Sequence, residues 1–147
     1  DDDDFIIGGS GNDLIDGGID DDTILGSSGQ DTVIGNDGDD VLLGEGGLDS
    51  LDGGDGSDTI DGGNDSDTIT GGGGADSILG GSGEDSIIGA TAGDTIDGGE
   101  GPVDFDTLDL RGSAPVDGRL EITYTSSDRE DGFVNYFNAL SILFLLF

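Results

Sequence analysis

The strongest constraint on this chain is a fixed nine-residue period that runs from residue 8 to residue 97. Ten consecutive units fill this stretch without an insertion, the first being residues 8–16 and the last residues 89–97. If each unit is numbered 1 to 9, position 1 is glycine, position 6 is aspartate and position 8 is aliphatic in all ten. A strict period of this kind is typical of a stacked repeat architecture, in which each unit packs against its neighbours.

The composition of one unit predicts a turn followed by a very short strand. Positions 1 to 6 are rich in glycine, with aspartate, asparagine and serine between, and glycine takes positive φ at little cost. Positions 7 to 9 predict a three-residue strand, with position 8 on one face and positions 7 and 9 on the other. Burying one aliphatic side chain contributes about 1.5–3 kcal/mol, whereas ordering the backbone costs about 1–2 kcal/mol per residue. A single unit therefore cannot fold, and a stack needs further stabilisation from its turns.

The position-6 aspartates predict where that stabilisation arises. They are Asp13, Asp22, Asp31, Asp40, Asp49, Asp58, Asp67, Asp76, Asp85 and Asp94. Stacked at a strand spacing of about 4.8 Å, neighbouring carboxylates would repel by on the order of 1 kcal/mol per pair in water. Cations would relieve this repulsion, and hard oxygen ligands in flexible turns suit Ca²⁺. Cysteine and histidine are both absent, so Zn²⁺ and Cu²⁺ lack their usual ligands.

The pattern Gly-Gly-x-Gly-x-Asp-x-U-x, in which U is apolar, resembles the RTX (repeats-in-toxin), or hemolysin-type, calcium-binding nonapeptide over about residues 3–110. The resemblance implies an all-β fold, a right-handed parallel β-roll (β-solenoid) in which two units make one turn. It also implies that several Ca²⁺ ions lie in the turns between units i and i+2. Each ion would take the position-6 aspartates of both turns, so that Asp13 pairs with Asp31 and Asp76 with Asp94.

The same resemblance implies backbone carbonyl ligands from positions 2 and 4 of one turn and positions 1 and 3 of the other. The glycines expected to supply these carbonyls are Gly9, Gly11, Gly18, Gly26, Gly29, Gly35, Gly38, Gly44, Gly47, Gly54, Gly56, Gly63, Gly72, Gly74, Gly81 and Gly83. Asn36, Asp20 and Asp65 replace glycine at positions 2 or 4 and tolerate the left-handed region. The tenth unit has Ala90 and Ala92 at these positions, and we expect its turn to be the weakest site or to bind no ion. Position 5 varies widely, which predicts that it faces solvent.

The repeat frays at both ends. Residues 1–7 fit the end of a preceding unit, with Asp4 at position 6 and able to pair with Asp22; a solvated, frayed terminus is the alternative interpretation. An eleventh unit starts at Gly98 and is interrupted by three extra residues around Pro102, after which Asp106 resumes position 6. Whether Asp106 reaches an ion is left open by the sequence.

Two regions are predicted: a calcium-binding β-roll over residues 1–110, and capping strands with a tail over residues 111–147. Residues 120–125 and 132–137 read as strands that could form a capping hairpin. Residues 139–147 are apolar apart from Ser141 and too few to span a bilayer. They fit a buried strand of a parent protein, a truncation artefact or part of an export signal. Because the chain starts with aspartate and shows no signal peptide, we expect it to be a fragment of a longer protein with other domains.

The charge excludes several partners. The formal net charge is -32, with 35 acidic and 3 basic residues. This excludes nucleic acid, and it disfavours anionic membrane surfaces and membrane insertion. An acidic disordered segment would carry a similar charge, but it would need no period.

These observations predict a calcium-ion-binding repeat module rather than an enzyme. Histidine, cysteine and lysine are absent, and no carboxylate pair stands out from the repeat as a catalytic one. The resemblance implies a module of a secreted, extracellular bacterial protein that passes a type I secretion channel unfolded and folds on binding Ca²⁺ outside. The alternative is a structural or adhesive spacer that presents its flat faces to a partner.

The position-9 residues bear on this alternative. Leu25, Leu43 and Leu79 are expected on one outer face, with Ile34 and Ile88 on the other. They fit either a docking surface or ordinary exposed aliphatic residues. A solenoid that needs no metal would conflict with the unbroken aspartate column.

Overall fold

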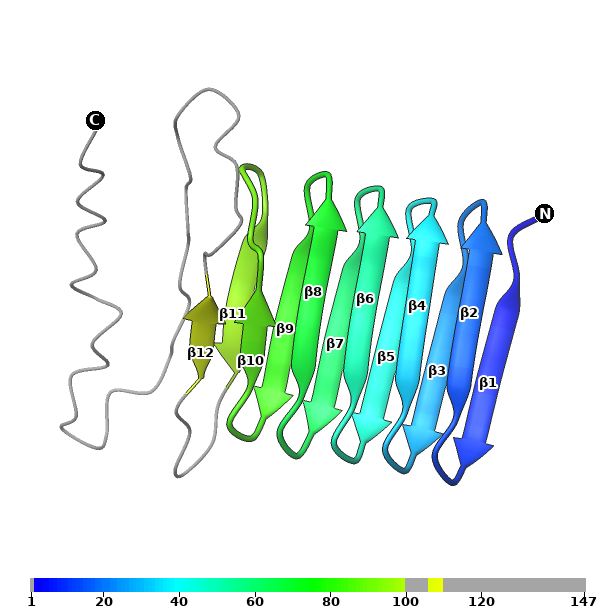
Figure 1. Ribbon diagram of the computed structural model, residues 1–147, viewed down its shortest axis with the longest axis horizontal. Coiled ribbons are helices and arrows are strands. Elements are labelled where there is room, and N and C mark those ends of the chain that lie inside the picture. Colours follow the sequence, from blue (N-terminus) through cyan, green and yellow to red (C-terminus); the bar gives the residue numbers. More distant parts are fainter. Residues whose placement is uncertain (1, 100–105, 110–147) are drawn as a thin grey trace, which may run out of the picture.

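The computed structural model describes residues 2–99 and 106–109, which form a β-solenoid of two facing parallel sheets (Figure 1). One sheet has the order β1-β3-β5-β7-β9-β11 and the other β12-β10-β8-β6-β4-β2. The strands are β1 (Phe5–Ser10), β2 (Leu14–Ile19), β3 (Thr23–Ser28), β4 (Thr32–Asp37), β5 (Val41–Gly46), β6 (Ser50–Asp55), β7 (Thr59–Asn64), β8 (Thr68–Gly73), β9 (Ser77–Ser82), β10 (Ser86–Ile88), β11 (Thr95–Gly99) and β12 (Thr107–Asp109). The predicted all-β parallel solenoid is confirmed.

The register of both sheets follows from the period. Each paired residue lies opposite the residue eighteen positions later, as Ile24 lies opposite Leu42 in β3 and β5, except between β10 and β12, where the offset is 21. Leu51 likewise lies opposite Ile69 in β6 and β8. Two nine-residue units therefore make one turn of the solenoid, as the resemblance implied.

The strands are twice as long as predicted. A typical strand such as β3 has six residues, comprising positions 7 to 9 of one unit and positions 1 to 3 of the next. The parallel pairing continues through these glycine-rich positions, since Ser27 lies opposite Glu45. Only positions 4 to 6 form the turn. The prediction of a six-residue turn was wrong because it assigned every glycine to a turn, although position 1 is a strand position.

The core is a single column of aliphatic side chains between the two sheets. It is formed by the position-8 residues Ile15, Ile24, Val33, Leu42, Leu51, Ile60, Ile69, Ile78, Ile87 and Ile96, all at most 7% exposed, together with Ala90. The position-1 glycines also face inward. Positions 7 and 9 face outward, as predicted. This thin core leaves the turns to supply the remaining stability.

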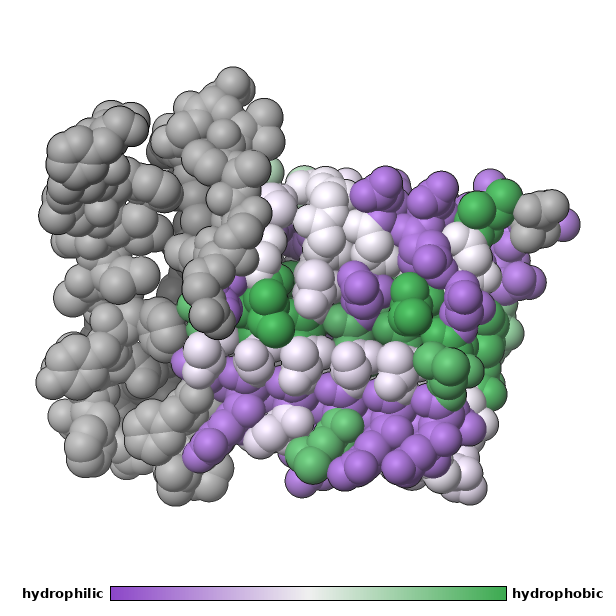
Figure 2. Space-filling model, viewed as in Figure 1, coloured by the Kyte–Doolittle hydropathy of each residue, from purple (hydrophilic) through white to green (hydrophobic). Residues whose placement is uncertain are grey.

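Hydrophobic side chains lie among hydrophilic ones on the outer face seen in Figure 2. The position-9 residues of β2, β4, β6, β8 and β10 are of both kinds, namely Asp16, Ile34, Asp52, Thr70 and Ile88. No helix within the described residues is long and apolar enough to cross a membrane. The predicted capping strands at 120–125 and 132–137 and the apolar stretch 139–147 lie outside the described residues.

Candidate metal centre

The position-6 aspartates form a hydrogen-bonded ladder along each edge of the solenoid. The backbone N–H of Asp22 donates to Oδ1 of Asp40 at 2.8 Å, and the N–H of Asp40 donates to Oδ1 of Asp58 at 2.9 Å. The same bond joins the pairs 4–22, 13–31, 31–49, 49–67, 58–76, 67–85, 76–94 and 85–106. The structure therefore brings the predicted aspartate pairs together, and each interior aspartate contacts the turns on both sides.

The second carboxylate oxygen of these aspartates has no donor. Oδ2 is buried and accepts no hydrogen bond in Asp13, Asp22, Asp31, Asp40, Asp49, Asp58, Asp67 and Asp76. Neither lysine nor arginine occurs among the described residues, so no cationic side chain there balances these oxygens. A buried anionic oxygen without a donor or counter-ion is costly. A cation bound from solution would balance these oxygens.

Each unpartnered Oδ2 faces a small space beside the position-1 glycine of its own unit. A Cβ placed on Gly17 would lie 2.6 Å from Asp22 Oδ2 and 3.0 Å from the carbonyl oxygen of Gly35 in the next stacked turn. On Gly26 it would lie 2.7 Å from Asp31 Oδ2 and 3.2 Å from the Gly44 carbonyl oxygen. Position 1 is glycine because these two oxygens border the same space, which a side chain would fill.

Backbone carbonyls of positions 1 to 4 also lie between the stacked turns. A Cβ on Gly54 would contact the position-2 carbonyl of Asn36, and one on Gly29 would contact the position-4 carbonyl of Gly11, so these carbonyls face the next turn. Position-1 carbonyls such as Gly35 face the preceding one. Position-3 carbonyls face back as well, and Ser28 already accepts a hydrogen bond from the Gly11 N–H at 2.9 Å.

The donor set is therefore two aspartates with backbone carbonyls. Among the described residues, no three acidic side chains gather closely enough to hold a metal ion by themselves. Oxygen-only donors in turns suit Ca²⁺, which accepts six to eight oxygens including carbonyls. The residues fit a calcium ion between stacked turns, and the ligand assignments to the sixteen predicted glycines remain predictions.

Positive φ at positions 2 and 4 sets the direction of the backbone carbonyls in each turn. Asn36, Asp20 and Asp65 take φ values of 81°, 77° and 72°, so the predicted tolerance of these residues is confirmed. Ser27 and Glu45 adopt the same conformation, with φ values of 84° and 72°. The turn geometry therefore persists without glycine, even where the residue type disfavours it.

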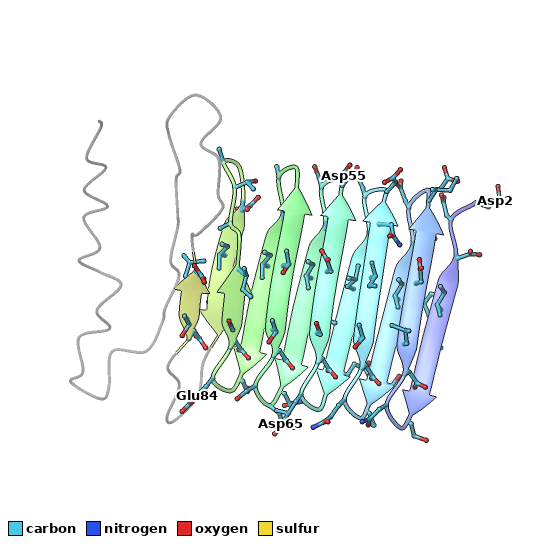
Figure 3. All side chains as sticks on the ribbon, viewed as in Figure 1. Asp2, Asp55, Asp65 and Glu84 are labelled. Carbon is cyan, nitrogen blue, oxygen red and sulfur yellow. The ribbon has the colours of Figure 1, made fainter. Side chains whose placement is uncertain are left out.

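Position 5 faces solvent in every described turn, as predicted. Its side chains also form a second, outer ladder that the sequence reasoning missed. Oδ1 of Asp21 accepts the N–H of Asp39 at 2.8 Å, and Oδ1 of Asp39 accepts the N–H of Ser57 at 2.7 Å. Short polar residues at position 5 were the available signal. Figure 3 shows side chains gathered along the two turn edges, with Asp55 and Asp65 at opposite edges.

The aspartates at both ends of the repeat keep the position-6 place. Asp4 donates its N–H to Oδ1 of Asp22 at 2.7 Å. Asp106 accepts the N–H of Asp85 at 3.0 Å, in spite of the three extra residues, and a Cβ placed on Gly98 would meet its side chain, as at the other position-1 glycines beside a position-6 aspartate. Asp94 differs, because its Oδ2 accepts the N–H of Thr91 at 2.6 Å.

Burial raises the pKa of the interior carboxyls. Desolvation is the main cause and raises the pKa of Asp67 to about 7 and that of Asp58 to about 6, above the ordinary 3.8. The carboxyls of Asp40, Asp49 and Asp76 shift in the same direction for the same first reason. Neighbouring aspartates add to these rises, whereas the backbone N–H bond to each carboxylate opposes them. Without metal, these carboxyls therefore stay protonated to a higher pH than ordinary aspartates do.

This shift predicts a pH dependence of the metal-free fold. Because the folded pKa lies above the unfolded 3.8, the protonated carboxyls stabilise the fold fully below that value, and the stability is lost as pH rises through about 6 to about 7. In metal-depleted buffer, far-UV circular dichroism should therefore show more β-structure at about pH 5 than at about pH 8. The Ca²⁺ affinity of the folded chain should be lower at the lower pH, since protons compete for the same oxygens. A metal-free spectrum that is independent of pH would contradict this, with sedimentation excluding aggregation.

Comparison with known proteins agrees with this geometry. The family model for the RTX calcium-binding nonapeptide repeat (4 copies) matches residues 1–33, 34–69 and 70–102, most of the chain. Neither the search of curated proteins nor the search of solved structures returned a match. With a repeat match over this length and the aspartate ladder in place, the chain belongs to the RTX calcium-binding nonapeptide repeat family.

Proposed function

We propose that this chain is a calcium-dependent folding module, which is unfolded at low Ca²⁺ and folds into the solenoid when Ca²⁺ binds. One observation carries the proposal: buried Oδ2 atoms without a donor, each beside a backbone carbonyl of the next turn, recur along the stack. Folding without a cation would bury these charges uncompensated. Folding with a cation at each step would satisfy both oxygens.

The energetic basis is linkage between binding and folding. A ligand that binds only the folded chain stabilises it by RT ln(1 + [L]/Kd) per site. For extracellular modules with Kd of roughly 10⁻⁴–10⁻³ M, about 10 mM Ca²⁺ contributes about 1.4–2.7 kcal/mol per site. Summed over several sites, this binding free energy can supply the stability that a core of one aliphatic residue per unit does not provide. The same arithmetic leaves the chain unfolded where Ca²⁺ is scarce.

This behaviour suits a module of a secreted bacterial protein, and we propose that setting, with export in the unfolded state through a type I channel. The family to which the repeats belong supports it. We also propose a binding role without catalysis, since the carboxylates of the repeat would be held by the ions. Other domains of a parent protein would carry any activity.

The test is far-UV circular dichroism during a Ca²⁺ titration from chelator to about 10 mM, a range that brackets extracellular sites. We expect a cooperative change from coil to β-structure. Mg²⁺ is the control, because it demands near-ideal octahedral geometry and gives up its water reluctantly. A β-rich spectrum already present in chelator at neutral pH would overturn the proposal.

A second function, a spacer that presents a flat face to a partner, is favoured by one feature. The position-7 and position-9 residues of β1, β3 and β5 are Phe5, Ile7, Thr23, Leu25, Val41 and Leu43. No carboxylate occurs at these positions before Asp61 on β7, although Glu45 at position 2 of β5 is exposed. Phe5 and Ile7 are 67% and 56% exposed. In a chain of this charge, an apolar row of this kind is a candidate contact surface.

Replacing Leu25, Leu43 and Leu79 together by serine tests this second function. If the face docks a partner or another copy, the triple variant should lose that association in Ca²⁺, measured by analytical ultracentrifugation. Its circular dichroism should match the wild type, because these side chains point away from the core. The matched control replaces Ile34 and Ile88 on the opposite sheet. Unchanged association in the triple variant would contradict the spacer role.

A further inference from the structure

The turn of the tenth unit, residues 89–94, departs from the regular geometry. Whereas β9 continues to Ser82 at position 3, β10 ends at Ile88, before position 1. Gly89 takes φ of +73°, a left-handed conformation that none of the position-1 glycines from Gly8 to Gly80 adopts. The strand therefore ends at position 9 here, whereas strands β1 to β9 continue to position 3.

The two alanines of this turn explain the departure. Ala90 and Ala92 occupy positions 2 and 4, where the other turns have positive φ, and neither alanine adopts it. Ala90 is instead only 2% exposed and packs with the aliphatic core. Ser27 and Glu45 keep the left-handed conformation at position 2 in spite of their Cβ atoms, whereas Ala90 does not adopt it and buries its methyl group in the core.

The position-1 carbonyl of turn ten lies further from the stacked turn than its counterparts do at Gly62 and Gly80. At Gly62 and at Gly80, a Cβ would meet the position-1 carbonyl of the next stacked turn. At Gly71 the three nearest atoms are Oδ2 and Cγ of Asp76 and Cδ1 of Ile78, all within 3.1 Å, and the Gly89 carbonyl oxygen is not among them. Together with the positive φ of Gly89, this shows that turn ten sets its position-1 carbonyl differently from those two turns.

Thr91 supplies protein donors at the same place. Its N–H donates to Asp94 Oδ2 at 2.6 Å. Its Oγ1 lies 3.3 Å from the Gly74 carbonyl oxygen and 3.3 Å from Asp94 Oδ1. Both oxygens of Asp94, and the position-4 carbonyl of turn eight, are therefore in contact with donors of the chain itself.

We propose that turn ten binds no Ca²⁺ and that the Thr91 N–H and hydroxyl replace the cation at the step between Asp76 and Asp94. This rests on the proposed function, since it concerns which steps of the stack bind the ion. Hydrogen bonds from N–H and O–H groups stabilise a carboxylate without bringing a positive charge. Asp76 keeps an unpartnered Oδ2 on its side of the step. Rebuilding turn ten alone should therefore complete a site.

The test is a gain of one ion. The double variant Ala90→Gly/Ala92→Gly restores glycine at positions 2 and 4 of the full chain. We expect it to bind one more Ca²⁺ per chain than the wild type, measured by equilibrium dialysis at saturating Ca²⁺. The matched control is Ala75→Gly, the same change at the exposed position 5 of turn eight. The control should bind the wild-type number.

A measurement on the wild type keeps the inference testable should the double variant fail to fold. In the Ca²⁺-saturated chain, the Thr91 amide proton should exchange slowly, because it stays bonded to Asp94. Equal ion numbers in wild type and a folded double variant would overturn the inference, as would a Thr91 amide that exchanges at the unfolded rate. If no ion binds to any of the three chains, the proposed function falls together with the inference.

Discussion

Replacing Asp49 by alanine is expected to remove two calcium ions from the chain, not one. Asp49 donates its N–H to Oδ1 of Asp67 and accepts the N–H of Asp31 at its own Oδ1, both at 2.8 Å. It therefore lies between the turns before and after it. With about 1.4–2.7 kcal/mol per site at about 10 mM Ca²⁺, the two losses should lower the free energy of unfolding by about 3–5 kcal/mol. Isothermal titration calorimetry counts the ions, and urea unfolding in Ca²⁺ measures the stability.

Two controls separate the ion from other effects of the substitution. Asp55→Ala removes the same formal charge from an exposed position-3 residue and should keep every ion. Asp49→Asn keeps an oxygen that can accept the Asp31 N–H but lacks the anionic charge. If the ladder bond alone mattered, the asparagine variant would retain the ions. Loss of a single ion in the alanine variant would refute the shared ligand.

The period predicted most of the fold because the interactions that matter repeat every eighteen residues. A contact that holds for one pair of units, such as Asp22 with Asp40, is expected for every pair with the same residues, so a sequence pattern alone locates it. The prediction that Asp106 resumes position 6 was correct in spite of the three-residue interruption near Pro102. The pattern Asp-Thr-Leu after the interruption restores the place of the strand β12.

The features that were missed depend on contacts between stacked turns. By composition, glycine at position 1 looks like a turn residue. In the structure, a side chain at Gly17 would collide with Asp22 Oδ2 and the Gly35 carbonyl oxygen. That reason is visible only when two turns are stacked. The role of Thr91 is a second case. The neighbouring alanines predicted an irregular turn. The residue type of Thr91 gave no indication that its N–H would donate to Asp94 Oδ2.

The second large effect is expected from a single methyl group at position 1. In Gly44→Ala, the new Cβ would lie 2.6 Å from Asp49 Oδ2 and would also contact the carbonyl oxygen of Gly62. Neither atom has room to move, because the first belongs to the aspartate ladder and the second to the backbone of β7. Overpacking of this kind costs about 1–3 kcal/mol, and the methyl group would also fill the space between the two oxygens, where we propose that the cation binds. We expect the variant to lose that stability in urea unfolding at saturating Ca²⁺, and to bind one ion fewer.

Gly46→Ala separates this steric effect from the general effect of adding a side chain. Gly46 lies two residues further along the same strand, and a Cβ there would meet only the Ser27 carbonyl oxygen, at 3.9 Å. Its φ is not in the left-handed region. Alanine there restricts the unfolded chain and should leave stability unchanged or raise it by up to about 1 kcal/mol. Equal destabilisation of the two variants would mean that position 1 is glycine for flexibility. A loss confined to Gly44→Ala would mean that the position is reserved for the two oxygens and the ion between them.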